Sequence, residues 1–355
     1  MATILGKSAI DIAFKERERQ KSFNYPRLRY MGSKYKIIPY LTSILSQYKF
    51  STALDAFSGS GVVSYSLKEM GKQVTANDFL NFPATVARAL IENSGTVLNE
   101  NDIKTLLQPN KDGRNFIQNK FEGLYFSKED HEFLDALWSH LPTMNKYKRA
   151  LAIASVCLAA ARKQPRGVFT ITDFRYDDGR RSLRLPLKAL FLEAVEEYND
   201  AVFDNGKSNK VICSDVFNID SRQFDLVYLD PPYAPPKDDA DYIKRYHFLE
   251  GLSVYWEGMK IMEHTKTKKI EKRFTPFAYK RTIHDALRRL FYKFKDSMLV
   301  MSYSSNSVPS EVELYGLLKE VKRDVQVYSI PHTYSFGTHE TALRRQAEEL
   351  IFVAK

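Results

Sequence analysis

Apolar residues along the chain fall into short continuous runs, separated by longer stretches in which they recur at helical spacing. The runs Thr52–Asp55, Gln73–Ala76 and Lys210–Ser214 have the length and composition of buried strands. Val62–Met70 follows the first run with a helical pattern. Further strand patterns lie at 224–229, 297–302, 325–330 and 350–354. Strands that alternate with helices predict an α/β fold.

Between the second and third strands, from about residue 83 to 208, the pattern is helical. Ser127 precedes acidic residues and predicts a helix start, and Trp138 follows at the spacing of a buried face. A second helix is expected from Tyr147 to Arg162. Its longest apolar run is too short to span a bilayer and predicts a core helix. Residues 1–25 have the pattern of a polar, partly helical arm.

Four of the expected strands end in an acid, at Asp55, Asp78, Asp215 and Asp230. Ligands of open α/β sheets bind at the carboxyl edge of the strands, so these carboxylates are candidates for one site. An acid at a strand tip can accept both hydroxyls of a ribose, which suits a nucleoside cofactor lying across the edge. For Asp78 the alternative is a helix cap or a turn.

The first strand runs into a glycine-rich turn, Asp55-Ala56-Phe57-Ser58-Gly59-Ser60-Gly61, and then into a helix. Glycine lets the backbone approach a ligand closely, and the N-terminus of the following helix favours a carboxylate. A lone Gly-x-Gly is weak evidence. Here the strand–turn–helix context that a cofactor loop requires is present as well.

The tetrapeptide Asp230-Pro231-Pro232-Tyr233 follows the strand at 224–229. Its carboxylate and a backbone carbonyl can accept the two N–H hydrogens of an amino group on a planar base, and its aromatic ring can stack on that base. The prolines fix φ and cannot donate to a ladder, so the strand ends here. The alternative is a simple turn, in which Asp and Pro are common.

In this order the motifs resemble those of the S-adenosylmethionine-dependent DNA adenine-N6 methyltransferases of the Dam-like, or D12, class. The resemblance covers residues 26 to 355 and includes a further motif at 29–34, where Tyr30 replaces the usual tryptophan. It implies a Rossmann-like methyltransferase fold with a seven-stranded, mostly parallel sheet. The catalytic domain would comprise 26–82 and 209–355, and a largely helical insertion at 83–208 would recognise the target DNA.

The resemblance also assigns site residues. Contacts to the cofactor, S-adenosyl-L-methionine, are expected from Tyr30, Lys34, Asp55, Phe57, Gly59, Gly61, Asp78 and Asp215. Lys34 would pair with the cofactor carboxylate, the alternative being a surface lysine. The expected catalytic residues are Asp230, Pro231, Pro232 and Tyr233, with Tyr233 stacked on an adenine that has left the duplex. No metal is needed, because a sulfonium is already an activated donor.

The net charge of +10 and the pI near 9.2 suit a polyanionic partner such as double-stranded DNA, although ordinary enzymes are often basic too. Eight Arg or Lys against three Asp lie in 162–188, and twelve against three acids lie in 260–295. We expect the first stretch to supply both base readers and phosphate contacts, from Arg166, Arg175, Arg180 and Arg181. The alternative is that Arg166 and Arg184 merely pair with acids of the insertion.

Both cysteines, Cys157 and Cys213, lie in apolar contexts and are expected to be reduced core residues. The charged N-terminal stretch lacks the apolar core of a signal peptide. The expected location is therefore the cytoplasm, in association with the nucleoid and not with a membrane.

Other functions share parts of this pattern. Cytosine-N4 methyltransferases more often carry Ser in place of Asp230, and RNA or protein-glutamine methyltransferases more often carry Asn. A DNA-binding subunit that has lost catalysis would be expected to lose the motif, which is intact here. The sequence interpretation is a modification enzyme of a restriction–modification system, monomeric or weakly dimeric, with a separate endonuclease. An orphan or phage enzyme is the alternative.

Overall fold

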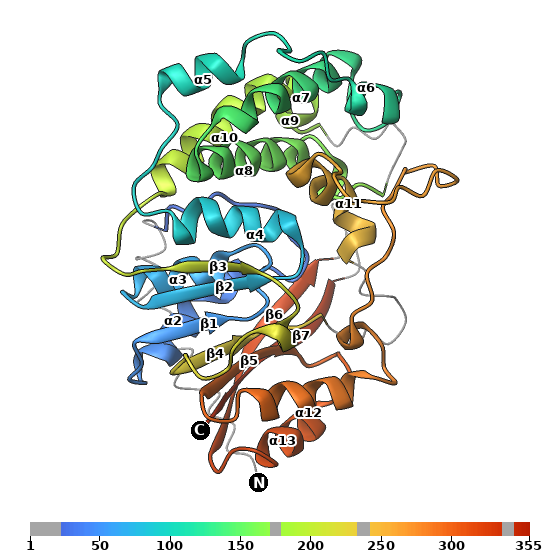
Figure 1. The fold of residues 1–355 in the computed structure, drawn as a ribbon. Helices are drawn as coiled ribbons and strands as arrows, with labels where there is room; N and C mark the ends of the chain where they lie inside the picture. The colour runs from blue at the N-terminus through green and yellow to red at the C-terminus, as the bar shows by residue number, and fades with distance from the viewer. Residues whose placement is uncertain (1–22, 171–178, 233–241, 336–343) are drawn as a thin grey trace.

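The computed structural model describes residues 23–170, 179–232, 242–335 and 344–355. A single seven-stranded sheet runs through the molecule in the order β3-β2-β1-β4-β5-β7-β6 (Figure 1). Its strands are β1 Thr52–Asp55, β2 Gln73–Asp78, β3 Lys210–Cys213, β4 Leu226–Leu229, β5 Met298–Ser304, β6 Val325–Ser335 and β7 Arg344–Ala354. Only β7 pairs antiparallel with its neighbours. The predicted mostly parallel sheet is confirmed.

Helices cover both faces of the sheet (Figure 1). They are α2 Ile38–Ser46, α3 Val62–Glu69, α4 Asn81–Ala87, α5 Glu100–Leu106, α6 Phe116–Lys120, α7 Lys128–His140, α8 Lys146–Arg162, α9 Arg181–Arg184, α10 Leu187–Ala201, α11 Tyr242–Val254, α12 Ile283–Lys293 and α13 Glu311–Lys319. Because successive side chains of a strand point to opposite faces, β4 contributes to two cores. Leu226 and Tyr228 pack in the core under α2, α3 and α4, and Val227 and Leu229 in the core under α12 and α13.

The segment from β2 to β3 is helical, as the sequence predicts. The Ser127 hydroxyl caps α7 by accepting the N–H of Asp130, Trp138 is buried, and α8 is buried along most of its length. Helices α7, α8 and α10 form a layer above α4 (Figure 1), and the core is continuous from the sheet into this layer. Residue 83, the expected start of the DNA-recognition insertion, lies inside α4.

The expectation that both cysteines lie in the core is wrong for one of them. Cys157 in α8 is buried, but Cys213 at the end of β3 is exposed. The reason is that β3 is an edge strand that pairs only with β2, and none of its residues is fully buried. Within the described ranges, no helix is long and apolar enough to cross a membrane.

Candidate active site

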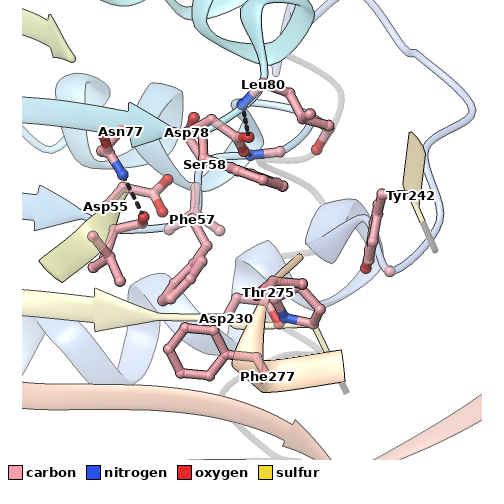
Figure 2. Close-up of a pocket in the computed structure, with 18 of the residues that line it drawn as sticks. Asp55, Phe57, Ser58, Asn77, Asp78, Leu80, Asp230, Tyr242, Thr275 and Phe277 are labelled. Atoms are coloured by element: carbon pink, nitrogen blue, oxygen red, sulfur yellow. Dashed lines mark hydrogen bonds between the residues drawn. The ribbon is translucent and has the colours of Figure 1, made fainter. Parts of the chain in front are cut away.

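The site lies where the strand order reverses, between β1 and β4. Strands β2 and β3 extend from β1 in one direction, and β5 continues from β4 in the other. At such a switch point the loops after the two central strands diverge and leave a crevice at their carboxyl ends. Here the crevice is a cavity that is partly open to solvent, and the unfilled space in and above it amounts to about 880 Å³. Asp55, Asp78 and Asp230 all line it (Figure 2).

Most of the residues singled out in the sequence meet at this cavity. Those that line it are Tyr30, Lys34, Asp55, Phe57, Gly59, Asp78, Asp215, Asp230 and Pro232. Gly61 is the N-cap of α3 and lies between two residues that line the cavity, Ser60 and Val62. Pro231 is buried and lies in the chain between Asp230 and Pro232, which both line the cavity. Tyr233, the expected base-stacking residue, lies outside the described residues.

The glycine-rich turn needs its glycines for space as well as for backbone conformation. Gly59 and Gly61 have φ values of +48° and +79°, which L side chains rarely adopt. A Cβ on Gly59 would lie 3.0 Å from the Tyr30 ring, and one on Gly61 would lie 2.7 Å from the Tyr25 hydroxyl. The turn is therefore packed directly against the N-terminal motif, and its backbone faces the cavity.

Asp78 fastens this turn to the end of β2. Its Oδ2 accepts the N–H of Gly59 at 2.9 Å, and its Oδ1 accepts the N–H of Leu80 at 3.0 Å. Asp78 therefore has the turn role that the sequence analysis gave as the alternative to ribose binding. Burial raises the pKa of Asp78 to about 6, against the lowering effect of these hydrogen bonds. Each carboxylate oxygen keeps a lone pair for a ligand hydroxyl.

Three buried polar atoms on the cavity wall lack a hydrogen-bond partner among the described residues. They are Asp55 Oδ1, Ser58 Oγ and Asn77 Oδ1. The other Asp55 oxygen accepts the Ser64 hydroxyl at 2.6 Å, and burial raises the pKa of Asp55 to about 7. Because buried polar atoms are nearly always paired, unpaired atoms gathered at one wall indicate a site for a polar ligand.

The opposite side of the cavity holds a buried cluster of charges. The Lys34 ammonium lies 2.8 Å from Asp230 Oδ2 and 3.3 Å from Glu349 Oε1, and it also donates to the Gly32 carbonyl at 2.9 Å. Lys34 is only 5% exposed and Glu349 only 2%. The surface-lysine alternative is therefore wrong, and Asp230 and Glu349, two carboxylates of the protein, are among the partners of Lys34.

Sequence reasoning did not find Glu349. It belongs to β7, which lies between β5 and β6 in the sheet, and it contacts Lys34 without lining the cavity itself. One more carboxylate in the sequence Ala347-Glu348-Glu349-Leu350 carries no signal of its own. The alternation of side chains in the strand, with exposed Glu348 and buried Glu349, is the one pattern that points to it.

Aromatic rings complete the walls. Phe57 contacts Phe277 edge to face, with ring centroids 5.3 Å apart, and Phe277 stacks on Phe217 at 5.8 Å. Tyr30 stacks on Tyr246 of α11 at 4.8 Å. Tyr242, the first residue of the same helix, also lines the cavity (Figure 2).

Asp215 is the most exposed of the strand-end acids. Its side chain accepts the N–H of Phe217 at 2.9 Å and caps a short 3-10 helix at the mouth of the cavity. It thereby stands beside the Phe217–Phe277 stack, where the flat ring of a nucleoside could lie.

The four arginines expected at DNA lie away from the cavity wall or outside the described parts. Arg181 at the start of α9 is exposed and pairs with Glu193 at 2.7 Å, and Arg180 donates to the Gln164 carbonyl at 3.3 Å. Arg175 and the side chain of Arg166 are not described. Arg181 thus has the kind of partner, an acid of the insertion, that the alternative proposed for Arg166 and Arg184.

With this geometry in place, comparisons with known proteins give a consistent result. The D12 class N6 adenine-specific DNA methyltransferase family matches residues 30–277, a range that contains every candidate site residue except Glu349. The chain is 31% identical to the type II methyltransferase M2.HphI of Haemophilus parahaemolyticus, over 93% of this chain and 98% of that protein. It is 22% identical to the type II methyltransferase M.FokI of Planomicrobium okeanokoites, over 92% of this chain and 53% of that protein. For the modification methylase StsI of Streptococcus sanguinis the identity is 24%, over 92% of this chain and 51% of that protein.

Proposed function

Since the chain belongs to the D12 class of N6 adenine-specific DNA methyltransferases, we propose that its methyl donor is S-adenosyl-L-methionine and that transfer takes place in the cavity between the ends of β1, β2 and β4. The observation that carries this proposal is that one cavity holds both the acid of the donor side, Asp78, and the acid of the catalytic motif, Asp230. A nucleoside donor and a target base can therefore meet in it.

The residues on the donor side fit such a cofactor. Asp78 offers acceptors for the ribose hydroxyls, and the unpartnered oxygens of Asp55, Ser58 and Asn77 offer further polar contacts. Gly59 lines the cavity, and the absence of a side chain there lets its backbone pack closely against Tyr30. Phe57 and the Phe217–Phe277 stack supply apolar surface for a flat ring, with Asp215 at its edge.

The chemistry required of the protein is set by the target amine. The lone pair of adenine N6 is delocalised into the ring, so the nitrogen is a poor nucleophile. The Asp230 carboxylate and the Pro231 carbonyl would accept its two N–H hydrogens and favour a pyramidal nitrogen with a free lone pair. S-adenosyl-L-methionine supplies an electrophilic methyl group on a sulfonium. The nitrogen loses its proton after it has gained the methyl group, when it is cationic and acidic.

Asp230 is thus a group that positions the amine and stabilises positive charge, and Lys34 and Glu349 are positioning residues that act through it. A carboxylate that must point a lone pair at one of these N–H hydrogens, while the Pro231 carbonyl takes the other, must not rotate. Its 2.8 Å ion pair to a lysine that is itself held by Glu349 and the Gly32 carbonyl fixes it in one orientation. Because Lys34 also pairs with Glu349, it competes less strongly with the target amine for the Asp230 carboxylate.

Recognition of DNA is assigned to the helical insertion at 83–208, with Arg166, Arg175, Arg180 and Arg181 as candidate contacts. The Arg181–Glu193 pair is solvent-exposed, so a phosphate can replace Glu193 at small cost.

The names of the relatives support a modification role in restriction–modification. We propose that any partner endonuclease acts as a separate protein and that this chain works as a monomer or weak dimer.

Transfer of tritiated methyl from S-adenosyl-L-methionine to duplex DNA, followed by nucleoside analysis, tests the proposal. The expected product is N6-methyladenine in a defined sequence. Label in N4-methylcytosine, in RNA or in protein would overturn the target assignment. Absence of label with folded protein that binds DNA would favour a catalytically inactive subunit.

A further inference from the structure

One exposed aromatic ring stands at the mouth of the cavity. Phe274 is 67% exposed and yet lines the same cavity as Asp230. Single exposed apolar residues are ordinary on protein surfaces, so exposure alone shows nothing. Among the described residues, the other large exposed apolar side chains, Val97, Tyr292 and Val312, do not line the cavity. The position of Phe274 sets it apart.

The ring is also held in place. Phe274 stacks on Tyr279 with centroids 5.5 Å apart and planes 15° apart. Its neighbour Arg273 donates to the Phe79 carbonyl at 2.8 Å and lies over the Phe79 ring at 4.8 Å. On the other side, Thr275 and Phe277 line the cavity (Figure 2). The chain is thus fastened on both sides of an aromatic face that remains open to solvent.

The surroundings of this ring are positively charged. Residues 272–281, which we call the rim segment, include no acid and have four exposed cations, Lys272, Arg273, Lys280 and Arg281. An oriented aromatic ring among cations suits a partner that offers flat apolar faces and regularly spaced negative charges. Stacked bases with their phosphates have that combination, and base–aromatic stacking needs no particular sequence.

Resting on the proposed function, we propose that the rim segment binds the duplex beside the target adenine and that Phe274 enters the space the adenine leaves when it is extruded. Extrusion costs the stacking of the target base on its neighbours. An apolar ring inserted at the vacated step restores part of that stacking, as apolar wedges do elsewhere in protein–DNA complexes. Arg281 would contact a phosphate next to this step. The rim segment follows the catalytic motif and lies outside the helical insertion to which recognition was assigned.

The competing occupant is the donor, since Phe274 borders the donor cavity too. Two variants of the full chain test whether Phe274 contacts DNA or the donor. They are Phe274→Ala and, as a matched control, Tyr292→Ala. Tyr292 is 64% exposed, lies on α12 near cations and is not on the cavity. Two duplexes carry the sequence that the wild-type enzyme methylates. One has adenine at the target position and reports the transfer rate; the other has 2-aminopurine there and reports extrusion, because 2-aminopurine has no amino group at C6 to accept a methyl group.

We expect Phe274→Ala to reduce the 2-aminopurine brightening and the single-turnover rate by about tenfold or more, since stacking on a base is worth roughly 1–3 kcal/mol. A mismatch opposite the target, which lowers the extrusion cost, should restore the rate to within about threefold of wild type. Phe274→Trp should keep most activity. Donor affinity by calorimetry, and all properties of Tyr292→Ala, should match wild type.

Arg281→Ala gives a second readout. It should weaken binding to cognate and random duplexes alike and lower the slope of log affinity against log salt by about one phosphate contact. Unchanged extrusion in Phe274→Ala, or a loss confined to donor affinity, would overturn the assignment of Phe274. Failure of the wild-type enzyme to methylate any DNA would instead refute the proposed function, independently of the rim segment.

Discussion

The two sides of the cavity are built in different ways. Most of the donor side comes from one continuous stretch, from Asp55 at the end of β1 to Leu80 after β2, to which Asp215 and the Phe217–Phe277 stack are added. Within that stretch the contacts of Asp78 run to backbone N–H groups. The base side joins Lys34, Asp230 and Glu349, which come from three distant parts of the chain, through side-chain charges. The central part of the donor side is therefore a local motif that forms with its strand–turn–helix unit. The base side exists only in the complete sheet.

This difference predicts which changes separate donor binding from catalysis. Asp230→Ala should abolish turnover while donor binding largely survives, because the donor contacts lie on the other strands. The loss of a preorganised electrostatic contact costs on the order of a hundredfold or more in rate. Single-turnover rates and donor calorimetry on the same preparation measure both effects. Turnover within a few-fold of wild type would remove Asp230 from its assigned role.

Asp78→Ala should show the opposite pattern. The change leaves ribose hydroxyls without acceptors and frees the N–H groups of Gly59 and Leu80, so donor affinity should fall by roughly 1–3 kcal/mol. At saturating donor the transfer rate should recover in large part. Equal donor affinity in calorimetry would return Asp78 to a purely structural turn role.

Glu349→Gln tests whether the remote residue of the base side acts through Lys34. With its second carboxylate neutralised, the lysine should hold Asp230 more tightly and leave it a weaker acceptor for the amine. We expect kcat to fall by about tenfold, or about 1.4 kcal/mol, with little change in KM for DNA or donor. Glu348→Gln, the exposed neighbour in β7, is the matched control. Glu349→Asp should recover part of the rate, and a thermal shift without a kcat change would show that Glu349 is only structural.

The pH dependence of donor binding follows from the two buried acids of the donor side. Burial raises the pKa of Asp78 to about 6 and that of Asp55 to about 7, so both take up protons in the folded protein as pH falls from 8 to 5. Protonation removes acceptor capacity, so donor affinity should fall over this range. The unliganded fold should gain stability over the same range, because it binds these protons before the unfolded chain does.

Calorimetry in matched buffers measures the first effect. Asp78→Asn should remove the part of the decline in donor affinity that is centred near pH 6. The part due to Asp55, near pH 7, should remain. A donor affinity that is constant from pH 8 to 5 in wild type would contradict the assignment of both acids to the donor.

The same contrast explains what the sequence could predict. Strands β1, β2 and β4, the glycine turn and the acids at their ends are local patterns, and each was found at its expected place. The partners of Lys34 were not predicted, because Asp230 and Glu349 come close to Lys34 only through the order in which the strands pair in the sheet. Cys213 was misplaced for a related reason: an apolar run shows a strand, but whether that strand is central or at an edge depends on which strands pair with it.

The smallest effect on stability and activity is expected at Arg181. Its ion pair with Glu193 is exposed to solvent, in contrast to the buried ion pairs of Lys34 on the base side. A surface pair of this kind contributes about 0–1 kcal/mol, so Arg181→Ala should barely change stability. If Arg181 binds a phosphate, Arg181→Ala should weaken DNA binding and lower the salt slope by about one contact. Glu193→Gln should then strengthen DNA binding by freeing the guanidinium, and the double variant should behave like Arg181→Ala alone. Salt titrations of the three variants on cognate and random duplexes decide this. If all three match wild type, Arg181 is a surface pair and the rim segment becomes the stronger candidate for DNA contact.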